Sequence, residues 1–178
     1  MKKNTIRSAT AEDNEGLKEL YVDAFPKGEG EVVSEIAIAL TESGTDRDAL
    51  SFVVDVDNQI IAHVSFSAVK CNEDSSIVSY CLAPLAVRKS LHKTGYGTKI
   101  VQYGLDYLKN KNTDVVLVYG DPNYYGRFGF VADLGKNFIV PYELEYDFGW
   151  QGLRLSERKI SSTQHCTFVT ALSDQKYW

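Results

Sequence analysis

The chain has 178 residues, 44% hydrophobic side chains and a formal net charge of −5. This length predicts one domain with a sizeable core, and the near-average composition excludes a disordered chain. The acidic balance argues against general nucleic-acid binding, and no apolar run approaches the ~18 residues of a membrane span.

The N-terminus and the cysteines indicate the compartment. Met1-Lys2-Lys3 is followed by polar residues and not by the apolar stretch of a secretory signal. The cysteines are odd in number, and no two have the CxxC spacing of a metal site. We therefore expect a reduced, cytoplasmic protein that contacts neither a membrane nor nucleic acid.

Two helices and then strands are predicted for the first half of the chain. Thr10 and Asp13 have the spacing of a capping box, which opens a helix that ends near Ala24. A second amphipathic helix follows at 33–40, and β-rich segments lie at 50–56, 60–69 and 77–87. Pro84 interrupts the last of these, because proline has no N–H to donate to a β ladder.

The second half of the chain alternates helices and strands. The predicted elements are a helix at 100–108, a buried strand at 115–119, a helical turn at 124–128 and weaker strands at 139–140, 153–155 and 167–172. Gly129 is placed to close the helical turn. This order favours one mixed α/β sheet with flanking helices.

The positive segment of this acidic chain runs from Ala86 to Thr113, with six basic side chains and one acidic. Within it a strand leads through Gly95 and Gly97 into a helix, and a helix N-terminus binds phosphate through its free N–H groups and dipole. A small polyanionic ligand suits this patch, although a solvated basic helix has the same composition. Ile100 stands where a dinucleotide GxGxxG would need glycine, and the chain has no P-loop motif.

A second candidate feature, at 120–130, follows the buried strand and contains two adjacent tyrosines. Ligands of open α/β sheets lie at the carboxyl ends of the strands. A phenol there, such as that of Tyr125, can donate a proton to a leaving group. The alternative is that both tyrosines are core aromatics.

The strand Leu82–Val87, the loop His92–Gly97 and the segment Tyr125–Phe130 together resemble the GNAT N-acetyltransferases. The sequence GDPNYYGRFGF at 120–130 resembles, more narrowly, a subgroup of small bacterial predicted acetyltransferases. The resemblance implies a GNAT-like α/β fold whose central mixed sheet is splayed between the strand ending at Val87 and the strand 115–119. It also implies acetyl-CoA as the cosubstrate and no metal.

The resemblance covers about Thr5 to Leu155, so we assign residues 4–155 to one GNAT domain. Residues 156–178 are then a C-terminal extension. Its apolar stretch at 168–172 suits an extra edge strand or a contact with a second subunit, and the sequence leaves a homodimer open.

The resemblance also assigns site residues. The implied coenzyme contacts are Leu85, Ala86, Val87, His92, Lys93, Thr94, Gly95, Tyr96, Gly97, Thr98 and Tyr125. Backbone groups of 85–87 hold the pantetheine arm, and the amides of 93–98 hold the pyrophosphate. His92 replaces the Gln or Arg of the family pattern, which affects a side-chain contact and not the backbone cradle. Tyr125 takes the general-acid position, and a backbone N–H near Val87 donates to the thioester oxygen.

The base and the acceptor site are less well specified. Glu31 and Glu35 lie on the second predicted helix, which borders the acceptor site in related folds, and their acidity suggests a cationic amine. His63 lies on a neighbouring strand, and Asp121 ends the central strand. Each has a structural alternative, in a solvated helix face, a core hydrogen bond or a turn. A water chain can also replace a dedicated base.

Aromatic residues after the tyrosine segment suggest a wall over the acceptor, with packing at the sheet edge as the alternative. They are Tyr142, Tyr146, Phe148 and Trp150. The histidines are too scattered for a zinc site, and no GxSxG marks an acyl-hydrolase.

The sequence therefore predicts an enzyme of the bacterial cytoplasm that moves an acetyl group from acetyl-CoA to a primary amine. The acceptor is a small molecule or a peptide amine, and the amine attacks the thioester directly. Two alternatives remain open at this point. One is a non-catalytic acyl-CoA sensor, and the other is a protein-interaction module whose basic segment binds an acidic partner.

Overall fold

The structure is a computed structural model that describes residues 4–42 and 48–178. The chain forms two compact units, one from residues 1–66 and 84–106 and the other from 67–83 and 107–178. Two long strands and one helix contribute residues to both units, so the division does not follow the chain order. None of the helices in the described ranges is long and apolar enough to cross a membrane.

After an N-terminal strand, the chain forms two consecutive helices, then a run of strands, and then further helices and strands. The helices of the described residues are α1 (Asn14–Ala24), α2 (Glu29–Glu42), α3 (Tyr96–Asn110), α4 (Pro122–Tyr125) and α5 (Ala132–Gly135). The strands are β1 (Asn4–Ser8), β2 (Ala49–Val56), β3 (Gln59–Cys71), β4 (Ser79–Val87), β5 (Val115–Tyr119), β6 (Phe138–Ile139), β7 (Trp150–Arg154) and β8 (Gln164–Phe168). Hydrogen bonds join them in the order β1-β2-β3-β4-β5-β7, and β8 pairs with β3 and β6. Parallel and antiparallel pairs occur in the same sheet, which confirms the predicted mixed α/β class.

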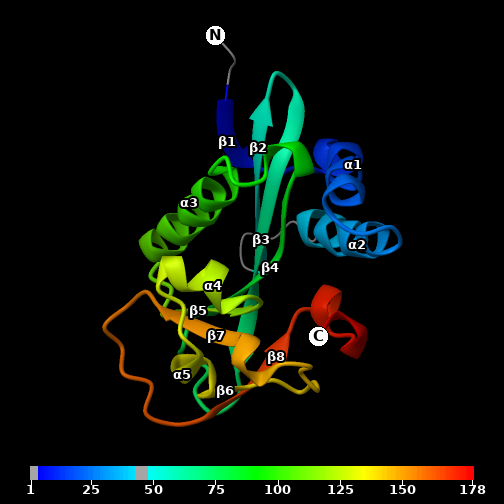
Figure 1. Ribbon diagram of the computed structural model, residues 1–178. Coiled ribbons are helices and arrows are strands. Elements are labelled where there is room, and N and C mark those ends of the chain that lie inside the picture. Colours follow the sequence, from blue (N-terminus) through cyan, green and yellow to red (C-terminus); the bar gives the residue numbers. More distant parts are fainter. Residues whose placement is uncertain (1–3, 43–47) are drawn as a thin grey trace. The chain divides into compact units, whose positions relative to one another are not determined.

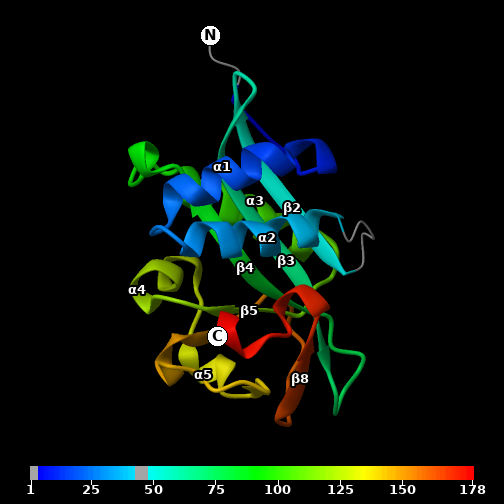
Figure 2. The ribbon, with the colours of Figure 1, turned by 90° about the vertical axis from the view of Figure 1, so that its right-hand side faces the viewer.

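In the first unit, α1 and α2 cover one face of the strands and α3 covers the other (Figures 1 and 2). The core between the strands and the two N-terminal helices contains Leu17, Tyr21 and Ala37, all fully buried. On the opposite face α3 lies close to β3, because a Cβ at Gly104 would come within 2.1 Å of the Phe66 ring. With both faces covered, polar side chains on β3 must also be buried.

The N-terminal strand β1 was missed by the sequence analysis. It pairs antiparallel with β2, from Asn4↔Val56 to Ser8↔Phe52. Ile6 is the single large apolar side chain in this segment, so the segment lacks the alternating hydrophobic pattern that predicts a strand. Its backbone hydrogen bonds to β2, rather than side-chain burial, define it.

In the second unit, β5 lies between a parallel and an antiparallel neighbour. The parallel register with β4 comprises three pairs and ends at Cys81↔Leu117, whereas β4 itself continues to Val87. Pro84 lies in this continuation, as predicted. The antiparallel register with β7 covers the whole of β5. The β4–β5 ladder thus involves the first three residues of β4, and the expected splay beyond it stays a prediction.

The extension at 156–178 adds β8 to the second unit, although not where the sequence predicted it. The strand covers Gln164–Phe168, and Thr170–Leu172 is a short 3-10 helix instead. Along β8, buried and exposed residues alternate, beginning with the buried Gln164. The prediction was wrong because it followed the apolar run rather than this alternation.

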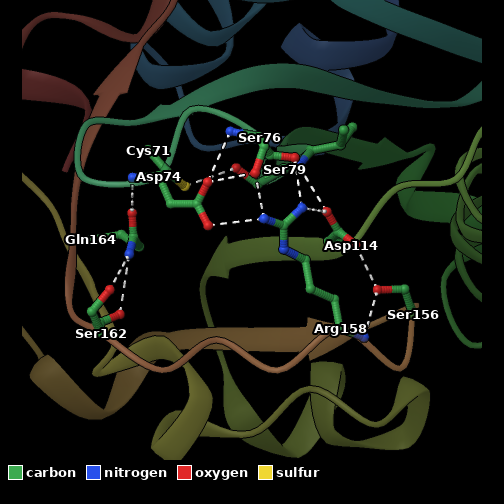
Figure 3. A network of polar contacts seen from close by, with 10 residues as sticks. Cys71, Asp74, Ser76, Ser79, Asp114, Ser156, Arg158, Ser162 and Gln164 are labelled. Carbon is green, nitrogen blue, oxygen red and sulfur yellow. Dashed lines mark hydrogen bonds and ion pairs between the residues drawn. The ribbon is translucent and has the colours of Figure 1, made fainter.

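A network of polar contacts also fastens the extension within the second unit (Figure 3). The Arg158 guanidinium donates to the Asp74 carboxylate at 2.8 Å and lies 3.5 Å from Asp114. Ser156 donates to Asp114 at 2.6 Å, and the Gln164 side chain accepts the Asp74 N–H at 2.9 Å. The extension is therefore an integral part of this unit.

Candidate functional site

The loop after β4, in the first unit, presents the start of α3. The Lys99 N–H donates to the Gly95 carbonyl at 3.0 Å, which is the first hydrogen bond of the helix. The amides of Gly97 and Thr98 precede that bond, so they have no acceptor within the helix. Gly95 has a φ of +93°, and a Cβ there would meet nothing within 4 Å. The loop thus leaves open space in front of a positive helix end.

His92 gives this loop its shape. Its Nε2 lies 2.8 Å from the Val87 carbonyl oxygen, which links the loop back to the end of β4. The Thr94 hydroxyl donates to the Leu91 carbonyl at 2.5 Å. His92 therefore has a scaffold role within the loop, and the backbone amides remain the phosphate-binding candidates.

The backbone at the end of β4 alternates in direction. The Arg88 N–H donates to the Ile61 carbonyl on β3 at 2.9 Å. Because successive peptide groups of a strand point to opposite sides, the Val87 N–H points away from β3. That is the direction expected of a donor to a bound substrate rather than to the sheet.

The segment after β5, in the second unit, forms the predicted helical turn. Asp121 caps α4 by accepting the Asn123 N–H at 2.9 Å, and Pro122 occupies the first helical position. Gly129, with a φ of 94°, ends the following 3-10 turn Gly126–Phe128. Gly129 was the closing signal in the sequence, and proline at the first helical position is also common at helix starts.

Tyr125 is held by aromatic packing in the second unit. Its ring lies 5.0 Å from that of Tyr124 and 5.8 Å from that of Phe130, both edge to face. Gly120 forms the remaining side, because a Cβ there would come within 2.5 Å of the Tyr125 ring. Burial, then Tyr124 and Cys81 nearby, raise the pKa of Tyr125 above its ordinary value of 10.0. The hydroxyl is therefore a proton donor at neutral pH.

Two of the candidate bases, Glu31 and Asp121, have structural partners. Glu31 accepts the Gly28 N–H at 3.0 Å, and both Glu31 and Glu35 are exposed on α2. Asp121 is the cap of α4. Glu31 and Glu35 thus belong to an acidic surface, and Asp121 is a helix cap. These hydrogen bonds do not identify any of the three as a dedicated base.

His63 lies in the interior of the first unit. It is 0% exposed, and its ring nitrogens lie 2.7 Å from the Tyr21 hydroxyl and 3.3 Å from the Ser65 hydroxyl. Ser65 in turn contacts Ser51 at 2.7 Å. Burial lowers the pKa of His63 to about 3, so the ring is neutral. This geometry is that of a structural histidine, the alternative stated for it from the sequence.

A model of the acetyltransferase (GNAT) family matches residues 14–130, a range that contains both the glycine loop and Tyr125. This chain belongs to the GNAT family.

Among curated GNAT relatives, an uncharacterized N-acetyltransferase, YhbS of Escherichia coli K12, is 39% identical over 77 residues. Those residues are 43% of this chain and 45% of that protein, so the match spans about half the length of the curated relative.

Solved GNAT structures share the fold over nearly the whole chain. YhbS from Escherichia coli in complex with CoA has a TM-score of 0.79 at 24% identity, covering 94% of this chain and 91% of that one. A GNAT family acetyltransferase from Brucella melitensis in complex with acetyl-CoA has a TM-score of 0.73 at 23% identity, covering 95% and 97%. At such identities the likeness shows the fold.

The predicted aromatic wall of this GNAT chain divides into two parts. Trp150 and Tyr142 pack against Trp178, with ring centroids 5.9 and 5.1 Å away. Tyr146 and Phe148 are 51% and 62% exposed. A cavity of about 900 Å³ in the second unit has Tyr142, Phe148 and Trp150 on its wall.

The sequence analysis missed two features of the site. The first is Gly120, whose missing side chain makes room for the Tyr125 ring. A glycine between a buried strand and two tyrosines is the sequence feature that could have indicated this close approach. The contact of His92 with Val87 was also missed, because it joins residues five apart through a loop without regular periodicity. Within 4–42 and 48–178, no cluster of three His, Cys, Asp or Glu side chains is arranged to hold a metal.

Proposed function

We propose that this protein transfers an acetyl group from acetyl-CoA to a primary amine, which attacks the thioester directly. The observation that carries the proposal is the open N-terminus of α3, inside the positive segment of an acidic chain. The family match and the CoA complexes of the similar structures support it. A bacterial cytoplasm remains the expected compartment.

The residues at the start of α3 suit a pyrophosphate. The amides of Gly97 and Thr98 supply donors, and the exposed Lys93 and Lys99 supply positive charge. The open space beside Gly95 lets phosphate oxygens approach the backbone. We assign the coenzyme contacts to residues 85–87, 92–98 and Tyr125, as the resemblance implies.

The acid is Tyr125, in the second unit. The reference pKa of tyrosine, ~10, exceeds the ~8.5 of a simple thiol, so bare proton transfer to the leaving thiolate is uphill by roughly 2 kcal/mol. Burial widens this gap by raising the pKa of Tyr125. We therefore infer a hydrogen bond that strengthens as charge develops on sulfur, with proton transfer coupled to loss of a proton from the amine.

The thioester oxygen gains charge as the amine attacks, and the N–H near Val87 is the proposed donor to it. Its direction away from β3 supports this role. No side chain is assigned as a dedicated base, and water carries the amine proton away. Glu31 and Glu35 attract a cationic amine to the surface of α2, and Asp121 remains a candidate for positioning it.

The test of the proposed function measures thiol release from acetyl-CoA with a panel of small-molecule and peptide amines. Release that depends on the amine supports the transferase. Binding of acetyl-CoA without release with any amine would favour the acyl-CoA sensor. Absence of CoA binding at two salt concentrations, measured by calorimetry, would favour the protein-interaction module.

A charge at the start of α3 tests the pyrophosphate contact. Thr98→Glu is expected to weaken CoA binding by about 10–100-fold, because a carboxylate would face the phosphates. The fold is retained, because an acidic side chain in the first turn stabilises a helix by about 0.3–1 kcal/mol. The control is Thr98→Gln, which has the same size without charge. Equal dissociation constants for the two variants, by calorimetry, would contradict the proposed contact.

A methyl group beneath Tyr125 tests the position of its hydroxyl. Gly120→Ala places a Cβ 2.5 Å from the Tyr125 ring, so the ring must move. We expect kcat to fall about 10–100-fold, because a shift of about 1 Å misaligns the donor, with CoA affinity nearly unchanged.

The matched control is Gly126→Ala. Its Cβ meets nothing within 4 Å, and its φ of −57° suits alanine. Normal kcat in Gly120→Ala, or an equal loss in Gly126→Ala, would argue against a positioned phenol.

A further inference from the structure

Two cysteines face each other across antiparallel strands in the second unit. Cys71, the last residue of β3, pairs in register with Cys166 of β8. Their exposed fractions are 2% and 4%, and both are free thiols in the structure. One comes from the family-matched part of the chain and the other from the extension.

The hydrogen bonds next to the pair define its geometry. The Asn72 N–H donates to the His165 carbonyl at 3.0 Å, so these residues form a hydrogen-bonded pair. In an antiparallel ladder the adjacent pair, Cys71 and Cys166, is then of the non-hydrogen-bonded kind. Such pairs have Cα atoms about 4.5 Å apart, which is within the 4.4–6.8 Å that disulfides usually span.

The chemistry around the thiols favours reaction at Cys71. The contact between the two thiols lowers the pKa of Cys71, against the opposing effect of burial, and raises the pKa of Cys166. The Ser79 hydroxyl lies 3.5 Å from the Cys71 sulfur (Figure 3). The third cysteine, Cys81, is also buried, and burial raises its pKa to about 12. The chain therefore contains its own unreactive reference thiol.

We propose that Cys71 and Cys166 form a reversible disulfide that fastens β8 to β3. The oxidant is a low-molecular-weight disulfide. The Cys71 thiolate attacks one of its sulfurs and releases a thiolate, which gives a mixed disulfide. The Cys166 thiolate then attacks the Cys71 sulfur and releases the second small thiol. Two protein thiols are oxidised, one small disulfide is reduced to two thiols, and the two protons from the cysteines end on these products.

Because both sulfurs are buried, the exchange requires β8 to open. This strand has a short register with β3, from Val69↔Phe168 to Cys71↔Cys166, and a two-residue register with β6. The extension is thus the element whose opening exposes the pair. Once formed, the bond links residues far apart in the chain, and cross-links of long loops restrict the unfolded chain most.

The experiment brings the full chain to equilibrium with mixtures of oxidised and reduced glutathione. Equilibrium is approached from the folded, reduced protein and by refolding in the same mixtures. Remaining thiols are alkylated and the peptides mapped by mass spectrometry. We expect a Cys71–Cys166 linked peptide with Cys81 alkylated, and a Tm higher by about 5–15 °C, both reversed by dithiothreitol.

Variants assign the shift to the pair. Cys166→Ser and Cys71→Ser are expected to lose the increase in Tm on oxidation, and Cys81→Ser to keep it. Three alkylated cysteines at every glutathione ratio, a stable glutathione adduct without a linked peptide, or a bond to Cys81 would each overturn the proposal. The peptide map of the unmodified chain decides the question even where a variant fails to fold.

Discussion

The Tyr125→Phe variant is expected to lose about 10²–10⁴-fold in kcat for acetyl transfer, the usual contribution of a general acid. Its affinity for CoA should stay nearly intact, because the ring still packs against Tyr124 and Phe130. Steady-state kinetics with an active amine and calorimetry with CoA separate the two quantities.

The matched control is Tyr124→Phe, which removes a hydroxyl from the neighbouring, partly buried ring. Its turnover should remain close to normal. If Tyr125→Phe turned over normally, the acid would have to be another group or solvent. Because the pKa of Tyr125 is raised, its hydroxyl also stays protonated at alkaline pH. No loss of activity from this group is therefore expected as amine acceptors become neutral.

Acidification from pH 7 to pH 5 is expected to lower the free energy of unfolding by about 2 kcal/mol through His63 alone. The folded pKa is about 3, and the ordinary value is 6.5. Below pH 6.5 the unfolded chain binds a proton that the folded chain does not, so stability falls with pH until about pH 3. The maximum slope is about 1.4 kcal/mol per pH unit.

Urea denaturation at pH 7, 6 and 5 measures this slope. His63→Gln, which removes the buried imidazole, should flatten it. The carboxylates whose pKa values are lowered by partners, such as Asp13 and Asp74, have reference values of 3.8 and titrate below this range. An equal slope in His63→Gln would show that the buried ring is not the source.

Local signals were enough to predict the parts of the chain that form the candidate site. Gly95, which has a positive φ, precedes the start of α3, and Gly129 ends the turn that follows Tyr125. These signals depend on a few neighbouring residues, so the local structure can be predicted from the sequence there.

The features that the sequence did not predict depend on distant partners. The sequence left His63 open between a site residue and a core residue, because its burial results from helices on both faces of β3, which one strand's alternation cannot show. The pairing of Cys71 with Cys166 depends on the register of two strands far apart in the chain. For the same reason β8 was misplaced, since its position is decided by β3 and β6 and not by its own apolar run.

The aromatic packing around Trp178 has a practical consequence for spectroscopy. The chain has two tryptophans, Trp150 and Trp178, and both lie in the second unit, with ring centroids 5.9 Å apart. Intrinsic tryptophan fluorescence therefore reports on the surroundings of Trp150 and Trp178 in the second unit. Opening of the C-terminal segment would change the signal directly, whereas events confined to the glycine loop would need a separately introduced fluorophore.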